Sequence, residues 1–217
     1  LRKEAREKGV DGHNMDHPGT KALVEKLLAQ YGKERLEDLP VNFRGIALAE
    51  GERAGNEIYD RVFGGLWRDY ETQARIQQWL GLAAPVLSVR ALSMAAAGTD
   101  FFQYRHFSSA VEAHRRRFIE VINDDITHNS RYGENYTPGR EVWEKVPSFE
   151  YEPPGAAWAL ANVRPAAVIL LLWLGLGCAA MAAGARLMTA EGAGRRFFAS
   201  TRVSGAEQAP EVVGAGG

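Results

Sequence analysis

The residues best placed to interact lie at the end of an apolar segment. Arg90 is near the centre of residues 79–98, and Gly98-Thr99-Asp100 follows directly. A buried guanidinium requires a partner, and the Asp100 carboxylate can supply one. Arg90, Thr99 and Asp100 are therefore candidates for a link between two helices. The link is either a structural ion pair or a coupling element between helices that move.

Other polar clusters carry weaker signals. His13, Asp16 and His17 have a spacing that suits a metal, but a glycine and a proline bracket them, so we expect a polar loop and no metal. The basic run 115–117 suits an anion or lipid head groups, although a solvated helix face explains it as well. No catalytic triad, paired carboxylates or phosphate loop stands out, so we expect no enzyme and no cofactor. The net charge of −1 gives no reason to expect nucleic-acid binding.

The dominant element of the chain is an uncharged stretch near its C-terminus. Residues 166–185, AAVILLLWLGLGCAAMAAGA, contain no charge and would extend roughly 30 Å as a helix. We expect a transmembrane helix over 164–187. Arginines follow this stretch, which places a cytoplasmic, largely disordered tail at 188–217 and makes residues 1–163 extracytoplasmic. A tail-anchored protein with residues 1–163 in the cytosol is the alternative.

The remaining pattern predicts an all-α domain of long antiparallel helices. Residues 1–45 form an N-terminal helical connector in which Thr20 caps a helix ending at Gly32, and residues 46–163 form the main domain. Apolar spacings of three and four predict helices over 47–80 and 101–125, the second capped by Asp100 or the preceding threonine. Within the first, Gly64 and Gly65 indicate a kink or a close helix approach. We expect a helical turn over 140–145 and an extended segment over 146–154.

Residues 79–98 allow two interpretations. The stretch is nearly long enough to cross a membrane, but Arg90 at its centre would cost about 2.5–3.5 kcal/mol. Pro85 suits the first turn of a helix and divides the stretch. We therefore expect a helix over 85–97 that is buried in the domain or lies against the membrane surface. A second membrane span is the alternative.

Three segments resemble one family of bacterial membrane proteins: PVNFRGIALAEGERAGNEIYDRVFGGLW, VRALSMAAAGTDFFQYRHFSSAVEAHRRRFIEVINDD and WEKVPSFEYEPPG. Over residues 38–187 the chain is similar to ABC-2 type permease subunits that carry a large extracytoplasmic helical insert. The resemblance implies a non-catalytic exporter subunit of the bacterial inner membrane. Its partners would be a separate ABC ATPase, sibling permease spans or a second permease subunit, and the lipid bilayer.

Two further expectations accompany this resemblance. The first residues, LRKEAREKGVDG, include no apolar signal region, so we expect a C-terminal part of a multi-pass protein. Gly177 and Gly184 are two turns apart on one face of the span and would allow close packing against another helix. The alternative function is a membrane-anchored helical sensor or scaffold that binds a protein partner.

Overall fold

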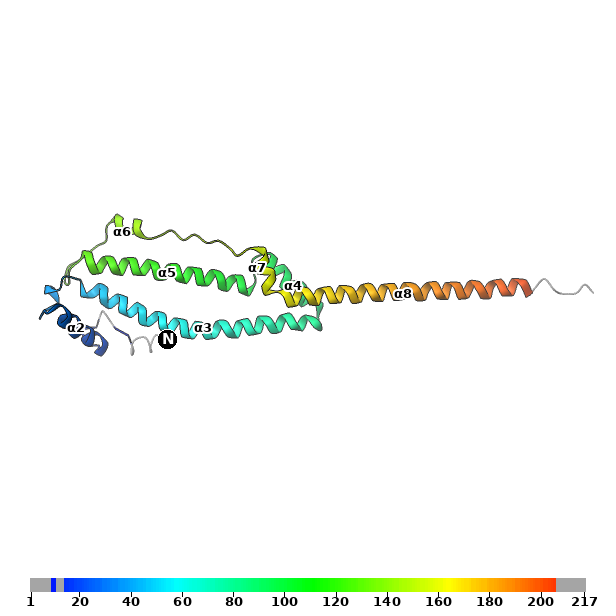
Figure 1. Cartoon of the computed structure of the whole chain (residues 1–217), viewed down its shortest axis with the longest axis horizontal. Helices are drawn as coiled ribbons and strands as arrows, with labels where there is room; N and C mark the ends of the chain where they lie inside the picture. Colours follow the sequence, from blue (N-terminus) through cyan, green and yellow to red (C-terminus); the bar gives the residue numbers. More distant parts are fainter. Residues whose placement is uncertain (1–8, 11–13, 206–217) are drawn as a thin grey trace, which may run out of the picture.

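The chain is all-α, as the periodicity predicts. The structure, a computed structural model, describes residues 9–10 and 14–205, and these contain no strand. The elements are α2 (Pro18–Tyr31), η1 (Leu36–Asp38), α3 (Phe43–Trp79), η2 (Leu80–Leu82), α4 (Pro85–Ala96), α5 (Phe101–Asn129), α6 (Arg140–Lys145), α7 (Ala156–Asn162) and α8 (Arg164–Gly205). Helices α3 and α5 lie side by side and form a long helical domain, and α8 projects from one end of it (Figure 1).

The end of the domain that is remote from α8 contains the main apolar cluster. Leu27 of α2, Leu39, and Phe43 and Ala47 of α3 are buried together. Phe43 also meets the ring of Tyr132 edge-on, with the ring centroids 6.0 Å apart. This cluster holds α2 against the beginning of α3.

Contacts between α3 and α5 run along the whole domain. Near the remote end, Gly45 of α3 lies so close to α5 that a Cβ atom there would stand 2.6 Å from the backbone nitrogen of Thr127. Near the α8 end, Arg105 of α5 donates to Glu71 of α3 at 2.9 Å. Early residues of α3 thus contact late residues of α5, and late residues contact early ones.

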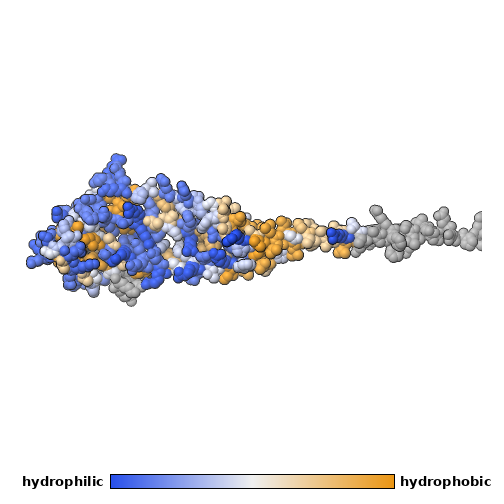
Figure 2. Space-filling view, viewed as in Figure 1, coloured by the Kyte–Doolittle hydropathy of each residue, from blue (hydrophilic) through white to orange (hydrophobic). Residues whose placement is uncertain are grey.

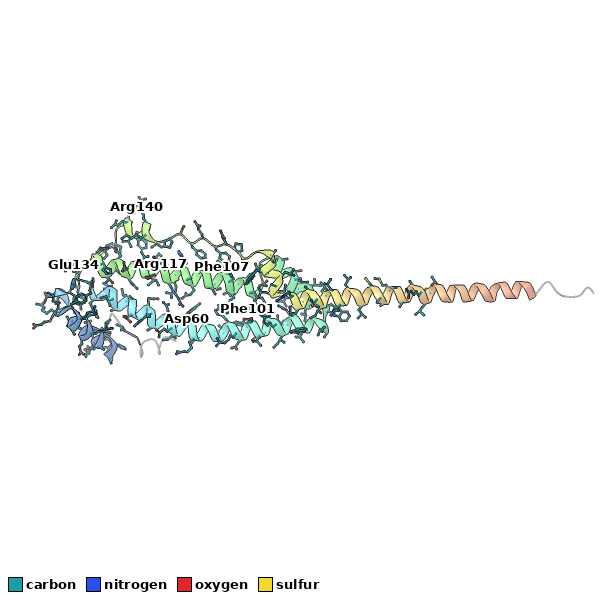
Figure 3. All side chains as sticks on the ribbon, viewed as in Figure 1. Asp60, Phe101, Phe107, Arg117, Glu134 and Arg140 are labelled. Atoms are coloured by element: carbon teal, nitrogen blue, oxygen red, sulfur yellow. The ribbon has the colours of Figure 1, made fainter. Side chains whose placement is uncertain are left out.

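The basic run of α5 pairs with carboxylates. Arg115 donates to Glu52 of α3 at 3.0 Å and to Glu112 at 2.8 Å. Arg116 bonds both Glu112 and Asp60, and Figure 3 shows Asp60 on α3 along the side of α5. Glu112 thus accepts from two arginines that follow it by three and four residues on the same helix. Hydrogen bonding from Arg115 is the main cause that lowers the pKa of Glu112, against the opposing effect of burial.

The structure corrects the predicted starts of α2 and α3 and agrees with the predicted end of α2. The helix α2 begins at Pro18 because the His17 ring accepts a hydrogen bond from the Gly19 amide at 3.2 Å, so Thr20 is a buried helical residue and not the cap. Gly32 ends α2 in the left-handed conformation with φ 60°, as predicted. Asn42 caps α3, which begins at Phe43, four residues before the predicted start.

Gly64 and Gly65 do not mark a close approach of another helix. A Cβ atom at either position would meet only the flexible guanidinium of Arg68, on the same helix, at 3.8–3.9 Å. The interpretation of the pair as a close-approach site is therefore wrong. The helix remains continuous from Phe43 to Trp79.

Helix α8 is the described helix long and apolar enough to cross a membrane. Arg164–Thr189 includes an 18-residue stretch with a mean hydropathy of 2.3, and most of this stretch is exposed. Figure 2 shows its apolar surface projecting from a mainly polar domain. The helix does not end near residue 187 but continues through residues 188–205. The last part of the predicted disordered tail, 206–217, lies outside the described residues.

The close approach at Gly45 predicts a strong effect of one methyl group. Replacing Gly45 by alanine would place a Cβ atom 2.8 Å from the Asn123 carbonyl oxygen, so we expect a loss of about 1–3 kcal/mol of unfolding free energy. Gly55→Ala in the same helix is the matched control, because no atom lies within 4 Å of its Cβ position. It should stabilise the helix by up to about 1 kcal/mol. Urea unfolding in detergent, followed by circular dichroism, measures the unfolding free energy of both variants. Equal changes in the two variants would contradict the close packing of Gly45 against α5.

The carboxylates between α3 and α5 predict sensitivity to acid. Hydrogen bonds from Arg75 and Arg116 are the main causes that lower the pKa values of Glu71 and Asp60, as Arg115 does for Glu112. Unfolding restores the ordinary values, so the unfolded chain binds more protons as pH falls.

This stabilisation is complete above the ordinary values of 4.5 for the glutamates and 3.8 for Asp60, and is lost as the pH falls through the lowered folded values. Unfolding free energy should therefore drop between neutral pH and about pH 3. The unfolding free energy of the Glu112→Gln variant should fall less over this pH range. An equal fall in the variant and the unmodified protein would exclude Glu112 as a source of the acid sensitivity.

Candidate functional site

The candidate site is the junction at which the helical domain meets α8. Here α4, η2 and the end of α3 pack against the first turns of α8. The Trp173 indole N–H donates to the Gly81 carbonyl oxygen at 3.1 Å. Ile169 of α8 is buried in the same contact, and the Gly81 Cβ position lies 3.5 Å from its Cγ2. The junction therefore attaches the domain to the side of the apolar helix.

A small cavity of about 110 Å³ lies within this junction. It is lined by residues of α3, α4 and α5 and by Val163, just before α8. Gln78 is 4% exposed and donates through Nε2 to the Asn162 carbonyl oxygen at 3.1 Å. Its Oε1 atom and the hydroxyl of Ser88 are buried without a hydrogen-bond partner in the described chain. Unpaired buried polar atoms typically cost about 1–3 kcal/mol each, so the junction is not optimised for stability.

Arg90 and Asp100 both line this cavity, but they do not form the expected ion pair. Arg90 is exposed and makes no ion pair within the described chain. The Asp100 carboxylate instead caps α5, accepting from the Gln103 amide at 2.9 Å and from its side chain at 3.3 Å. The sequence identified the cap correctly. It missed Gln103, whose Nε2 also donates to the Ala95 carbonyl oxygen of α4 at 2.7 Å.

Thr99 belongs to the turn that joins α4 to α5. Its amide donates to the Met94 carbonyl oxygen at 2.9 Å, which closes the end of α4. The preceding Gly98 has φ 73°, a conformation that glycine adopts readily. Asp100, Gln103 and Thr99 together fix the α4–α5 turn against the junction. Hydrogen bonds, and not the expected ion pair, therefore join α4 to α5 at this turn.

An apolar groove of about 1090 Å³ opens beside the junction. It is lined by the end of α4, the start of α5, the 151–154 segment and α7. Aromatic rings hold the extended segment on α5: Phe107 meets Tyr151 edge-on at 5.1 Å between centroids. The His106 ring lies 3.1 Å from the Tyr151 hydroxyl. Figure 3 shows Phe107 on α5, beneath this segment. Alternating aromatic and polar residues over 146–154 are the sequence signal for this packing.

The candidate helix-packing face of α8 is open. No atom lies within 4 Å of the Cβ positions of Gly177 and Gly184. Cys178, between them, is a free and exposed thiol. His17, from the histidine cluster, caps α2, whereas His13 lies outside the described residues.

The arrangement at Asp100 predicts which substitutions destabilise the junction. Asp100→Ala removes the α5 cap and should reduce the unfolding free energy by about 1–2 kcal/mol. Asp100→Asn keeps a capping oxygen and should cost less. Arg90→Ala should leave stability nearly unchanged, since no ion pair is lost. Denaturation of the three variants in detergent measures these differences. A loss at Arg90→Ala equal to that at Asp100→Ala would restore the ion-pair interpretation.

The comparisons with known proteins give one match. The model of the family described as Domain of unknown function (DUF3526) matches residues 1–152, which cover the helical domain up to the end of the 146–152 segment. No curated protein and no solved structure matches the chain. Because the family model covers more than half of the chain, the protein belongs to the DUF3526 family.

Proposed function

We propose that this chain is the membrane subunit of an ATP-driven ABC-2 type exporter and that it performs no catalysis itself. A separate ATPase would supply the energy. Helix α8 would cross the bacterial inner membrane, and the helical domain of antiparallel α3 and α5 would lie outside the cytoplasm. The resemblance to permease subunits motivates this proposal. The observation that carries it is an exposed apolar helix with a polar helical domain attached directly to its side.

The attachment of domain to span suits transmission of motion. Trp173 and Ile169 of α8 hold Gly81, and Gly81 lies in the turn between α3 and α4. A change in the packing of α8 against sibling helices would therefore move the domain with it. The unpaired Oε1 of Gln78 supports this role, because a junction with an unsatisfied polar atom can gain hydrogen bonds by rearranging.

The charge distribution supports the orientation. Arg186 ends the apolar stretch on the side opposite the domain, and further arginines follow in the sequence. The domain would then gate the exit of the cargo or dock an extracytoplasmic partner. The open groove beside α7 gives such a partner an apolar surface. The same groove favours the second candidate function, a membrane-anchored sensor or scaffold that binds a protein.

Co-purification with the ATPase from a neighbouring gene tests the exporter proposal. We expect the two proteins to elute together in mild detergent. Gly177→Leu with Gly184→Leu should abolish this association, because bulky side chains would block the small-residue face. Gly175→Leu with Ala182→Leu is the matched control, since these residues have the same seven-residue spacing on the opposite face.

Three results bear on this proposal. If the Gly177/Gly184 variant still associates with the ATPase, helix packing through these glycines is not required for assembly. Failure of the unmodified protein to associate with the ATPase would favour the sensor or scaffold. A protease added to intact spheroplasts should degrade the helical domain, and its protection would contradict the extracytoplasmic orientation.

A further inference from the structure

The turn between α3 and α4, with the residues on either side of it, exposes an apolar surface at the α8 end of the domain. Residues 76–89 contain no charged side chain. Six large apolar side chains of this turn are between 47% and 67% exposed: Ile76, Trp79, Leu80, Leu82, Val86 and Val89. Contiguous exposed apolar surface of this kind marks contact with a membrane or another protein. The same surface continues onto α8 in Figure 2.

Contacts with α8 determine the depth of this turn. Gly81 lies at the level of Ile169, five residues beyond Arg164 and three beyond Ala166, where the uncharged stretch begins. At 1.5 Å per residue, the turn lies about 8 Å below Arg164 and about 4–5 Å below Ala166. If α8 crosses a bilayer, the turn therefore lies in the outer part of the acyl-chain region and not in water.

Arginines flank the uncharged turn on both sides. Arg75 precedes it on α3 and is held by Glu71 at 2.7 Å. Arg90 follows it on α4, is exposed and lacks an ion-pair partner in the described chain. Arg90 and Val163 line the same cavity, so Arg90 lies near the level of Arg164. Arginines at this level can reach phosphate groups while the apolar side chains enter the lipid.

The backbone of the turn is compatible with lipid, where polar groups must bond internally. The Gly81 carbonyl oxygen accepts from Trp173, and the amides of Ala83 and Ala84 donate to the Leu80 carbonyl oxygen at 3.0 and 3.1 Å. Pro85 has no amide hydrogen to satisfy. The twelve residues of α4 extend only about 18 Å, which is too short for the second span considered above.

We propose that residues 76–89 insert as a wedge into the leaflet on the domain side of the bilayer, in contact with phospholipid. Arg90 and Arg164 lie at the level of the lipid phosphates. The inference rests on the proposed crossing of the membrane by α8. It adds a second membrane contact that holds the domain at a fixed depth and tilt.

Spin-label accessibility in lipid nanodiscs tests the wedge. The full chain carries Cys178→Ala, and single cysteines are introduced at Leu82 and Val86, with Leu172 as the span reference and Ser109 as the water reference. The discs contain phosphatidylcholine and phosphatidylglycerol, with one chain per disc. Relaxation of the spin label by oxygen indicates that the labelled residue contacts lipid. Relaxation by a water-soluble nickel complex indicates that it contacts water. Circular dichroism confirms that each variant is folded.

Labels at Leu82 and Val86 should resemble Leu172, with oxygen relaxation dominant, and Ser109 should show the reverse ratio. If Leu172 is accessible to oxygen but Leu82 and Val86 are accessible to nickel, the wedge is excluded and the span remains. If both reagents fail to reach Leu82 and Val86, protein covers the turn and the lipid assignment is overturned. Accessibility of Leu172 to nickel would instead refute the crossing by α8, and with it the exporter proposal.

Discussion

The hydrogen bond from the Trp173 indole to the Gly81 carbonyl oxygen links the two parts of this molecule. It joins a helix that is apolar on all sides to the turn of a polar helical hairpin. A tryptophan at this depth of the uncharged stretch needs a polar partner for its N–H group. The Gly81 carbonyl oxygen supplies one, and the absence of a side chain on Gly81 lets Ser88 of α4 pack closely against it. This contact, together with the buried Ile169 and the packing of α4 on α8, fixes the domain against the side of α8.

Polar groups between α3 and α5 are likewise satisfied by partners, so Arg115 and Arg116 of α5 do not form an open basic surface. Glu112 accepts from Arg115 and Arg116, which also reach carboxylates of α3. The run looks like an unmatched basic cluster in the sequence because two of its partners, Glu52 and Asp60, are about sixty residues away along the chain. Only the pairing of α3 with α5 reveals that the charges are matched.

The sequence predicted local features well. The period of the apolar residues predicted α3 and α5, and the glycine and proline positions predicted the end of α2 and the start of α4. It also located α6 at residues 140–145 and the cap at Asp100. These features depend on neighbours within a few residues, which one sequence contains.

Features that depend on distant residues were not predictable from spacing. The partner assumed for Arg90 was chosen by proximity in the sequence, but the packing of α4 leaves Arg90 exposed, and Asp100 bonds Gln103 instead. Nothing in the sequence distinguishes Gly45 and Gly81 from other glycines, although Gly45 contacts α5 closely and Gly81 contacts α4 closely. Because aromatic residues flank Gly64 and Gly65, the sequence suggested a close helix approach there, whereas the close approach is at Gly45.

The length of α3 has a mechanical consequence. Its 37 residues extend roughly 55 Å from the attachment at α8 to the apolar cluster at the remote end. Within the described residues, α8 contacts the helix pair at its base, so a tilt of α8 would move the pair as a lever. A tilt of α8 by about 10° would carry the tip sideways by roughly 10 Å, calculated from that length. Small rearrangements within the apolar helix would thus be amplified into displacements as wide as a helix.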